Sequence, residues 1–209
     1  MDGFETALIW LDYAAVAVFG ATGALAAARR KHDIVTFGFF AAITGVGGGT
    51  LRDLLLGAPV VWVHQPAYLV ACLLAAVAVW LFGAKRGRYR LLIWLDALGM
   101  AAYSVAGAAK AGALGAPPLT AVVLGVLTAT FGGIVRDVLA DEPSVLLKRE
   151  IYVTAALVGA ATYVGLGLLG VGAAVAGLAG FGAALALRAG ALVFGWSLPG
   201  FPGRASPED

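Results

Sequence analysis

The sequence predicts an all-α integral membrane protein with seven transmembrane helices, arranged as two inverted three-helix repeats plus one extra helix. Composition, a succession of apolar stretches and an internal repeat predict this class. The chain has 209 residues, of which 61% are hydrophobic and 12% are charged. Soluble domains are nearer half apolar and a quarter charged. Little of the chain is therefore expected outside the bilayer.

Composition also excludes several functions. The net charge is only +2, and the basic residues lie in short loops, so nucleic acid is not an expected partner. Cys72 is the single cysteine, so an intrachain disulfide is excluded. His32 and His64 fall in different loops, and no Ser/His/Asp set, phosphate loop or cysteine cluster is visible. We expect no enzyme, no metal site and no cofactor.

Seven apolar stretches are long enough to span a bilayer, which takes about 20 helical residues. They cover residues 7–28, 34–56, 66–84, 91–112, 117–140, 150–169 and 172–194. The first is predicted to be a retained span and not a signal peptide, because no basic segment precedes it and Asp12 interrupts it.

Lys and Arg in the short loops predict the orientation. Basic residues follow the first, third, fifth and seventh spans, whereas the alternate loops hold little charge. The N-terminus is therefore expected outside and the C-terminus in the cytoplasm. Lys110 ends the fourth span and is expected to extend outward. The basic loop at 85–90 can contact anionic lipid head groups, but topology alone explains it.

An internal repeat appears when the chain is shifted by 84 residues. Leu8-Ile9-Trp10-Leu11-Asp12 then falls on Leu92-Ile93-Trp94-Leu95-Asp96. Further matches join Gly23 to Gly107, Thr36 to Thr120, Thr44 to Thr128, Gly48-Gly49 to Gly132-Gly133, Arg52-Asp53 to Arg136-Asp137, Pro59 to Pro143 and Tyr68 to Tyr152. Trp, Asp, Arg, Pro and Tyr are scarce here, so chance does not explain their agreement.

The repeat divides the chain into four parts. Residues 1–84 form the first three-helix repeat, 85–170 the second, 171–197 the seventh helix and 198–209 a disordered tail rich in Pro and Gly. Three spans are an odd number, so the second repeat enters the membrane from the other side. Transporter folds of this kind place their site at the repeat interface, on discontinuous helices.

The second and fifth spans each carry a stripe of small and charged residues at helical spacing. The stripes are Thr44, Gly48 and Arg52, and Thr128, Gly132 and Arg136. Further glycines at 47, 49 and 133 weaken the helices, so glycine-broken helices are expected. One interpretation is a pore lined by both stripes, because intramembrane charges are functional candidates. The other is close helix packing with a structural ion pair.

The depth of the charged residues within the bilayer predicts two charge clusters, one toward each mouth of the membrane path. At 1.5 Å per residue, Arg52 lies about 27 Å from Ile34, near the outer surface of a ~30 Å core. Asp12 or Asp53 can pair with Arg52 there. By inversion, Asp96 or Asp137 can pair with Arg136 on the inner side. The alternative is that these pairs only orient the helices and never meet a permeant species.

The glycine motif at 47–53, its partner at 132–137 and the three-plus-three-plus-one layout resemble the trimeric intracellular cation channel family, in its prokaryotic branch. The resemblance covers residues 7–194. It implies a homotrimer in which each protomer has its own pore, lined by kinked second and fifth helices and permeated by monovalent cations, chiefly potassium. By position, Gly47, Gly48, Gly49, Arg52 and Asp53 match the first kink, and Gly132, Gly133, Arg136 and Asp137 match the second. Phe131 stands where a third glycine would complete the second copy.

The short tail further implies a prokaryotic plasma (inner) membrane. Spacing alone indicates a two-fold-related membrane path, and the arginines by themselves argue against cations, so the assignment of potassium depends on the resemblance. Three functions are weighed: a passive cation channel, a secondary transporter of a small solute such as a small amino acid, and a non-transporting scaffold. Inverted repeats are typical of transporters, which makes the second a serious alternative.

Overall fold

Eight helices make up the described part of the chain, which in this computed structural model covers residues 3–82, 88–142 and 151–199. They are α1 (Gly3–Arg29), α2 (Ile34–Leu55), α3 (Val61–His64), α4 (Ala67–Phe82), α5 (Arg88–Ala113), α6 (Pro118–Leu139), α7 (Val153–Leu168) and α8 (Ala173–Phe194). The seven long helices match the seven predicted spans to within a few residues. The single-turn α3 was not predicted; it lies between Pro59 and Pro66, which limit its length.

The predicted all-α membrane class is confirmed. Four of the described helical segments are long and apolar enough to cross a bilayer: Ile34–Leu55, Arg90–Ala113, Pro118–Leu139 and Ala173–Phe194. The apolar helices α4 and α7 have 16 residues each. At 1.5 Å per residue, each is about 24 Å long, which is less than the ~30 Å hydrocarbon core.

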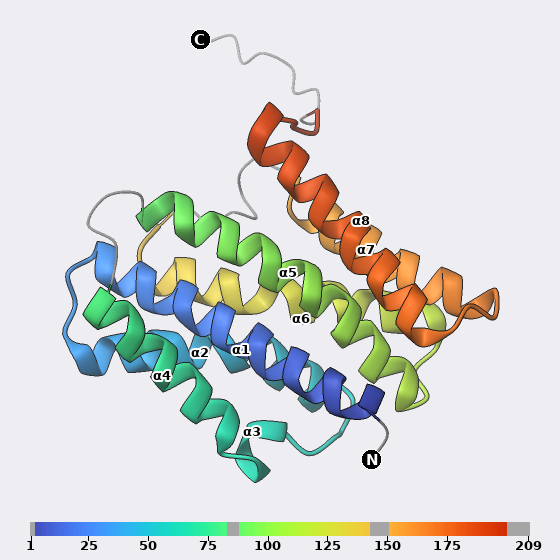
Figure 1. Ribbon diagram of the computed structural model, residues 1–209, viewed down its shortest axis with the longest axis horizontal. Coiled ribbons are helices and arrows are strands. Elements are labelled where there is room, and N and C mark those ends of the chain that lie inside the picture. The colour runs from blue at the N-terminus through green and yellow to red at the C-terminus, as the bar shows by residue number, and fades with distance from the viewer. Residues whose placement is uncertain (1–2, 83–87, 143–150, 200–209) are drawn as a thin grey trace, which may run out of the picture.

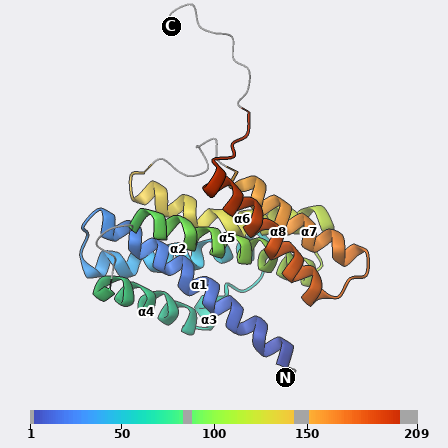
Figure 2. The ribbon, with the colours of Figure 1, turned by 45° about the horizontal axis from the view of Figure 1, so that its top comes forward.

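The helices form one layered bundle (Figures 1 and 2). Helix α1 packs against α2, α4 and α5, while α6 lies against α2, α5 and α7. Helices α7 and α8 form a pair at one side of the bundle, where both contact α5. The bundle thus places α2 and α6 next to each other at its centre.

Glycine contacts between helices repeat at the 84-residue shift. A Cβ added to Gly23 on α1 would lie 2.7 Å from the Thr44 hydroxyl on α2. A Cβ added to Gly107 on α5 would lie 2.7 Å from the Thr128 hydroxyl on α6. Real Cβ atoms do not approach this closely, so these glycines let the two helices of each pair touch, as small residues do in membrane bundles.

The prediction that the second and fifth spans are glycine-broken is wrong. Helices α2 and α6 are continuous from Ile34 to Leu55 and from Pro118 to Leu139. Glycine weakens an isolated helix by about 1 kcal/mol per residue. Here the lack of a side chain lets a neighbouring helix pack directly against the glycine backbone. The packing interpretation of the glycines therefore describes this structure.

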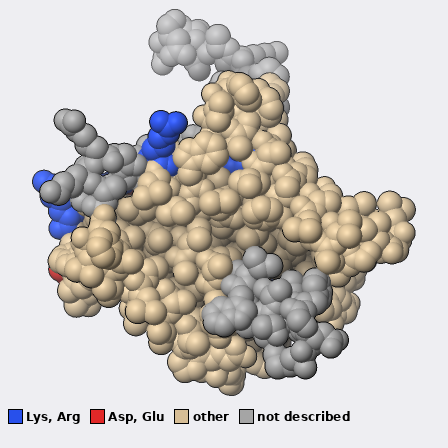
Figure 3. Space-filling view, viewed as in Figure 1, with Lys and Arg blue, Asp and Glu red and all other residues tan. Residues whose placement is uncertain are grey.

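Basic side chains gather at one end of the face in Figure 3, where α1 passes into α2 and α5 begins (Figure 1). The rest of that face, where it is not drawn in grey, shows almost no charged side chain. Arg29 at the end of α1 pairs at 2.7 Å with Glu142, which follows α6. The predicted basic residues Lys85, Arg86, Lys148 and Arg149, the repeat residue Pro143, and tail residues 200–209 lie outside the described residues.

Candidate functional site

Helices α2 and α6 cross antiparallel at their glycines. A Cβ on Gly48 would collide with the carbonyl oxygen of Thr128, and a Cβ on Gly132 would collide with that of Thr44. Both threonines and both glycines are buried. Gly47 also faces this contact, since its added Cβ would lie 3.8 Å from the Gly132 Cα. The two stripes therefore meet each other, and their arginines lie on opposite sides of the crossing.

The first charge cluster surrounds Asp53 near the end of α2. Arg52 donates from Nε to Asp53 Oδ1 at 2.9 Å, and its Nη2 lies 2.8 Å from the same oxygen. Lys110 Nζ on α5 lies 2.9 Å from Asp53 Oδ1. The backbone N–H of Val61 donates to Asp53 Oδ2 at 3.3 Å. Asp53 is thus a buried carboxylate held by two cations, of which Lys110 is 30% exposed.

The second charge cluster surrounds Arg136 near the end of α6. Arg136 donates from Nε to Asp137 Oδ1 at 2.9 Å and from Nη1 to Asp96 Oδ1 at 2.6 Å. Nη1 also donates to the hydroxyl of Thr22 on α1 at 3.0 Å. Only 1% of the Arg136 side chain is exposed. Both carboxylates considered for this arginine from the sequence are therefore its partners.

Each cluster contains four residues that correspond under the 84-residue shift. We call Asp12, Gly49, Arg52 and Tyr68 the first tetrad, and Asp96, Gly133, Arg136 and Tyr152 the second tetrad. In the first tetrad, the Tyr68 hydroxyl donates to Asp12 Oδ2 at 2.7 Å. Among the described residues, Asp12 and Arg52 form no ion pair. Of the two partners considered for Arg52, the structure selects Asp53.

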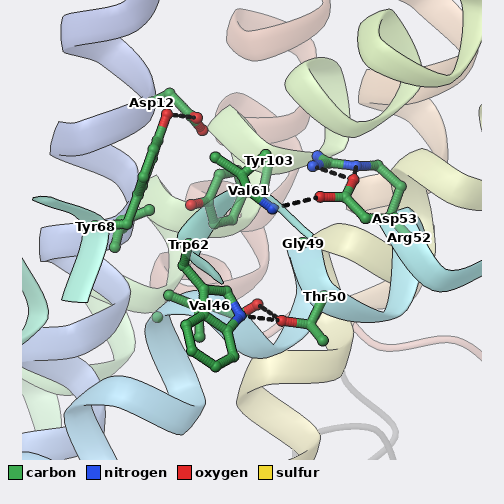
Figure 4. A pocket seen from close by; sticks show the side chains of 12 residues that line it. Asp12, Val46, Gly49, Thr50, Arg52, Asp53, Val61, Trp62, Tyr68 and Tyr103 are labelled. Carbon is green, nitrogen blue, oxygen red and sulfur yellow. Dashed lines mark hydrogen bonds and ion pairs between the residues drawn. The ribbon is translucent and has the colours of Figure 1, made fainter. Parts of the chain in front are cut away.

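A cavity of about 30 Å³ opens at the first tetrad (Figure 4). Asp12 and Tyr68 lie on one side of it, and Arg52 with Asp53 on the other. Trp62 also lines the cavity, and its indole Nε1 donates to the Thr50 hydroxyl at 2.9 Å (Figure 4). About 10–15 Å³ suffices for one water molecule. The first tetrad therefore borders a small polar chamber.

The second tetrad is closed. A Cβ on Gly133 would lie 3.1 Å from the Tyr152 hydroxyl oxygen, 3.3 Å from Asp96 Oδ1 and 3.6 Å from Arg136 Nη2. Three buried atoms here have no hydrogen-bond partner in the described part of the chain: Asp96 Oδ2, Arg136 Nη2 and the Tyr152 hydroxyl. Arg136 Nη2 still lies 2.8 Å from Asp137 Oδ1 as an ion pair.

Several residues of these clusters were not predicted from the sequence. Lys110 was expected to extend outward, but it pairs with Asp53. Tyr68 and Tyr152 were noted only as matching positions. Arg188 on α8 is buried, with its guanidinium 5.1 Å from the centre of the Tyr152 ring and Nη1 donating to the Ile151 carbonyl at 3.3 Å. A lone arginine in an apolar stretch was the available signal for Arg188.

Within the described residues, no three His, Cys, Asp or Glu side chains are grouped so that they could hold a metal ion. The clusters are instead networks of paired charges, tyrosines and glycines. Such a site can order water and small ions.

Comparison with known proteins gives a family model described as Glycine transporter, which matches residues 9–84 and again residues 93–167. The two matches begin at residues 9 and 93, an offset of 84 residues. A UPF0126 membrane protein of Vibrio cholerae is 36% identical over 207 residues, covering 94% of this chain and 84% of that protein. The UPF0126 inner membrane protein YadS of Escherichia coli is 40% identical over 155 residues, covering 72% and 74%.

Solved structures are also similar. The TRIC trimeric intracellular cation channel orthologue from Rhodobacter sphaeroides is 50% identical, with a TM-score of 0.89, covering 91% of this chain and 100% of that chain. A second TRIC cation channel structure is 30% identical with a TM-score of 0.82, covering 94% and 98%.

Proposed function

The chain belongs to the TRIC cation channel family, and we propose that it is a passive channel for monovalent cations, chiefly potassium. Its bacterial relatives are the UPF0126 membrane proteins. Each protomer has its own pore, formed along α2 and α6. No covalent chemistry is required of the protein.

The proposed architecture has seven spans in two inverted repeats, 1–84 and 85–170, followed by the extra helix of residues 171–197. The antiparallel crossing of α2 and α6 supports inversion, because each glycine faces the threonine of the other repeat. The family model also matches once in each repeat. In this arrangement the first tetrad lies toward the outer mouth and the second toward the cytoplasmic mouth.

One observation carries the choice of a cation as the permeant species. Asp12 lines the cavity at the first tetrad with a tyrosine hydroxyl as its hydrogen-bond partner, and forms no ion pair with Arg52. The charge of Arg52 is balanced by the adjacent Asp53. A cavity that presents a carboxylate attracts cations and raises their local concentration. The arginines therefore do not oppose a cation path.

Conduction requires the centre of the bundle to loosen. Thr44 and Thr128 are each 1% exposed, and the backbones touch at Gly48 and Gly132. The crossing therefore closes the path in the form described here. Because glycine has no side chain, a small separation of α2 and α6 would expose carbonyl and hydroxyl oxygens, which are the groups that replace the hydration shell of potassium in channels.

The assembly is proposed to be a homotrimer embedded in the lipids of a prokaryotic plasma (inner) membrane. The N-terminus faces outward and the C-terminus faces the cytoplasm, following the distribution of Lys and Arg. A trimer fits the apolar outer faces of the helices, such as those with Leu74, Leu81 and Phe82 exposed on α4. Native mass spectrometry of the detergent-purified protein tests this assembly.

Single-channel recording tests the function. Purified protein in a planar bilayer should give unitary currents whose reversal potential follows a potassium gradient. Asp12→Asn keeps the size of the side chain and an acceptor for Tyr68, and should lower the unitary current several-fold. Asp33→Asn, an exposed carboxylate at the start of α2, is the matched control and should leave the unitary current unchanged. Absence of any unitary current would refute the channel.

Glycine transport is the second candidate, because the matching family model bears that description. Liposomes loaded with the protein should then take up labelled glycine saturably and with ion coupling. Uptake without unitary current would favour the transporter, whereas current without uptake would favour the channel. If both signals are absent, a non-transporting membrane scaffold is the remaining function.

A further inference from the structure

The single-turn helix α3 forms part of the wall of the cavity at the first tetrad. Its first two residues, Val61 and Trp62, line the cavity. Its last two residues, Val63 and His64, are exposed. One turn of helix therefore lies between the cavity and the surroundings of the protein, and Trp62 is the largest side chain in this part of the wall.

Hydrogen bonds hold α3 against the end of α2. The backbone N–H of Val61 donates to Asp53 Oδ2 at 3.3 Å, and the backbone N–H of Ala58 donates to the Asp53 carbonyl at 2.9 Å. The indole Nε1 of Trp62 donates to the Thr50 hydroxyl at 2.9 Å (Figure 4). The wall is thus fixed both through its backbone and through its largest side chain.

The Thr50 hydroxyl fixes the orientation of the indole ring. This hydroxyl donates its proton to the Val46 carbonyl at 2.7 Å and accepts the proton of Trp62. An indole has one N–H and no other polar group, so Thr50 is the partner that its polar atom uses. Both Val46 and Thr50 line the cavity. The space beside the ring therefore depends on one hydroxyl group.

The second half of the chain lacks the residues for this bond. Under the 84-residue shift, Thr50 corresponds to Ile134 and Trp62 corresponds to Leu146. Neither of these side chains has a polar atom, so neither can donate or accept a hydrogen bond. The bond between Trp62 and Thr50 is therefore specific to the first half, where the cavity is present.

We propose that Trp62 is a specificity-determining residue of the outer mouth, where its ring, held by Thr50, sets the largest cation that can enter the cavity. This inference depends on the proposed function as a channel. The cavity has about 30 Å³, whereas one water molecule needs about 10–15 Å³. A potassium ion without its hydration shell is similar in size to a water molecule and fits there. Tetramethylammonium, with four methyl groups, does not fit.

The first test adds tetramethylammonium to the outer side of a planar bilayer that contains the channel. Trp62→Ala removes the ring and lets this cation reach Asp12, where it blocks the potassium current. The concentration that halves the current should fall about tenfold relative to the parent, because the steric overlap is relieved. Trp80→Ala is the matched control, because this exposed tryptophan packs on Phe37 and does not line the cavity. It should leave the half-blocking concentration unchanged.

Thr50→Val tests the hydrogen bond while the ring stays present. Valine has the shape of threonine but cannot accept from the indole, so the ring is free to turn away from the cavity. The half-blocking concentration of tetramethylammonium should fall about fivefold, as expected for the loss of one neutral hydrogen bond. Thr50→Val also decides the question if Trp62→Ala does not assemble.

A second readout does not depend on current. Val16 lines the cavity from α1, so Val16→Cys in a Cys72→Ala background places a thiol there. This protein in nanodiscs is treated with 2-aminoethyl methanethiosulfonate or with its bulkier trimethylammonium analogue, and mass spectrometry follows the modification. The rate for the bulky reagent relative to the small one should rise about tenfold with Trp62→Ala. The ratio should not change with Trp80→Ala.

The outcomes separate this inference from the channel itself. A raised reagent ratio without any current would refute the channel and still support Trp62 as the residue that limits entry to the cavity. Potassium current with an unchanged block and an unchanged reagent ratio in Trp62→Ala would overturn the inference and leave the channel standing. A Thr50→Val protein that matches the parent in both measurements would also overturn it, because the ring would then not depend on its hydrogen bond.

Discussion

The first and second tetrads consist of the same four residue types but differ in whether the aspartate binds the arginine. Asp12 accepts from a tyrosine and borders a cavity, whereas Asp96 binds an arginine in a closed site. The four repeated residues therefore do not by themselves determine which partner the aspartate binds or whether a cavity is present. The neighbours that differ between the two halves must do so.

Those neighbours are identifiable. Tyr68 stacks on Tyr13 with ring centroids 4.4 Å apart, while the residue at the matching position of the second half is Ala97. Tyr152 instead lies under Arg188 on α8, a helix beyond both segments that the family model matches. Lys110 adds a second cation to the first cluster. Each half thus receives its own additional ring or cation.

Removing the arginines should give the largest effect and the clearest contrast. Arg136→Ala leaves Asp96 and Asp137 buried without their cation, which should cost about 3–5 kcal/mol of stability. Arg52→Ala should cost less, because Asp53 keeps Lys110 and the N–H of Val61. Thermal unfolding followed by size-exclusion chromatography in detergent measures both variants. Equal losses would contradict the distinction between a closed and an open tetrad.

The helix crossing should respond equally in the two halves. Gly48→Ala and Gly132→Ala each push a methyl group into a threonine carbonyl of the other helix, at a cost of about 1–3 kcal/mol. Gly49→Ala is the control, because its methyl group would meet only Arg52 Nη2 at 3.6 Å. Thermal unfolding of the three proteins should rank the first two together and the control near the parent. A large gap between Gly48→Ala and Gly132→Ala would break the similarity of the halves at the crossing.

Lys110 offers a smaller test of the first cluster. Lys110→Gln removes a partly exposed cation, and exposed pairs contribute about 0–1 kcal/mol. The loss should shrink in high salt, because solvent-accessible charges are screened. Tm measured at low and high ionic strength checks this expectation. A salt-independent loss well above that range would place Lys110 among the buried charges.

The smallest effect is expected at the starts of α2 and α6. Asp33 caps α2 by accepting from the Thr36 N–H at 2.9 Å, whereas α6 begins at Pro117-Pro118 without a side-chain cap. The Thr36 N–H lowers the pKa of Asp33 below its ordinary value. The cap therefore stabilises the protein above that ordinary value, about 3.9, and this contribution is lost as the pH falls through the lowered pKa. Asp33→Ala should lower Tm slightly at neutral pH, and the difference should vanish in acid.

Helix positions could be predicted from the sequence because apolar length decides them, and the seven long helices agree with the predicted spans. Pairing of Arg52 and Arg136 with carboxylates was also predictable, since each arginine precedes its own aspartate. The position of the glycines inside continuous helices was not predictable, because glycine statistically disfavours helix. Only the Thr128 and Thr44 carbonyls across the interface explain Gly48 and Gly132 within continuous helices.

The tetrad states could not be predicted because tertiary neighbours decide them. Asp12 and Asp96 occupy identical pentapeptides, Leu-Ile-Trp-Leu-Asp, yet bind different partners. Arg188 and Lys110 have no repeat signal, since Ser104 and Ala26 occupy the positions 84 residues before them. The sequence therefore predicts which groups meet at each cluster more reliably than which hydrogen bond each group makes.

The position of Arg188 late in the chain bears on biogenesis. Arg52 and Arg136 each reach the bilayer with an aspartate at the next residue, so each carries its counter-charge during insertion. Arg188 has an apolar, small-residue helix around it. Synthesis proceeds from the N-terminus, so Tyr152 and the Ile151 carbonyl leave the ribosome before Arg188 does. The last helix therefore inserts after the residues that Arg188 contacts have already been synthesised.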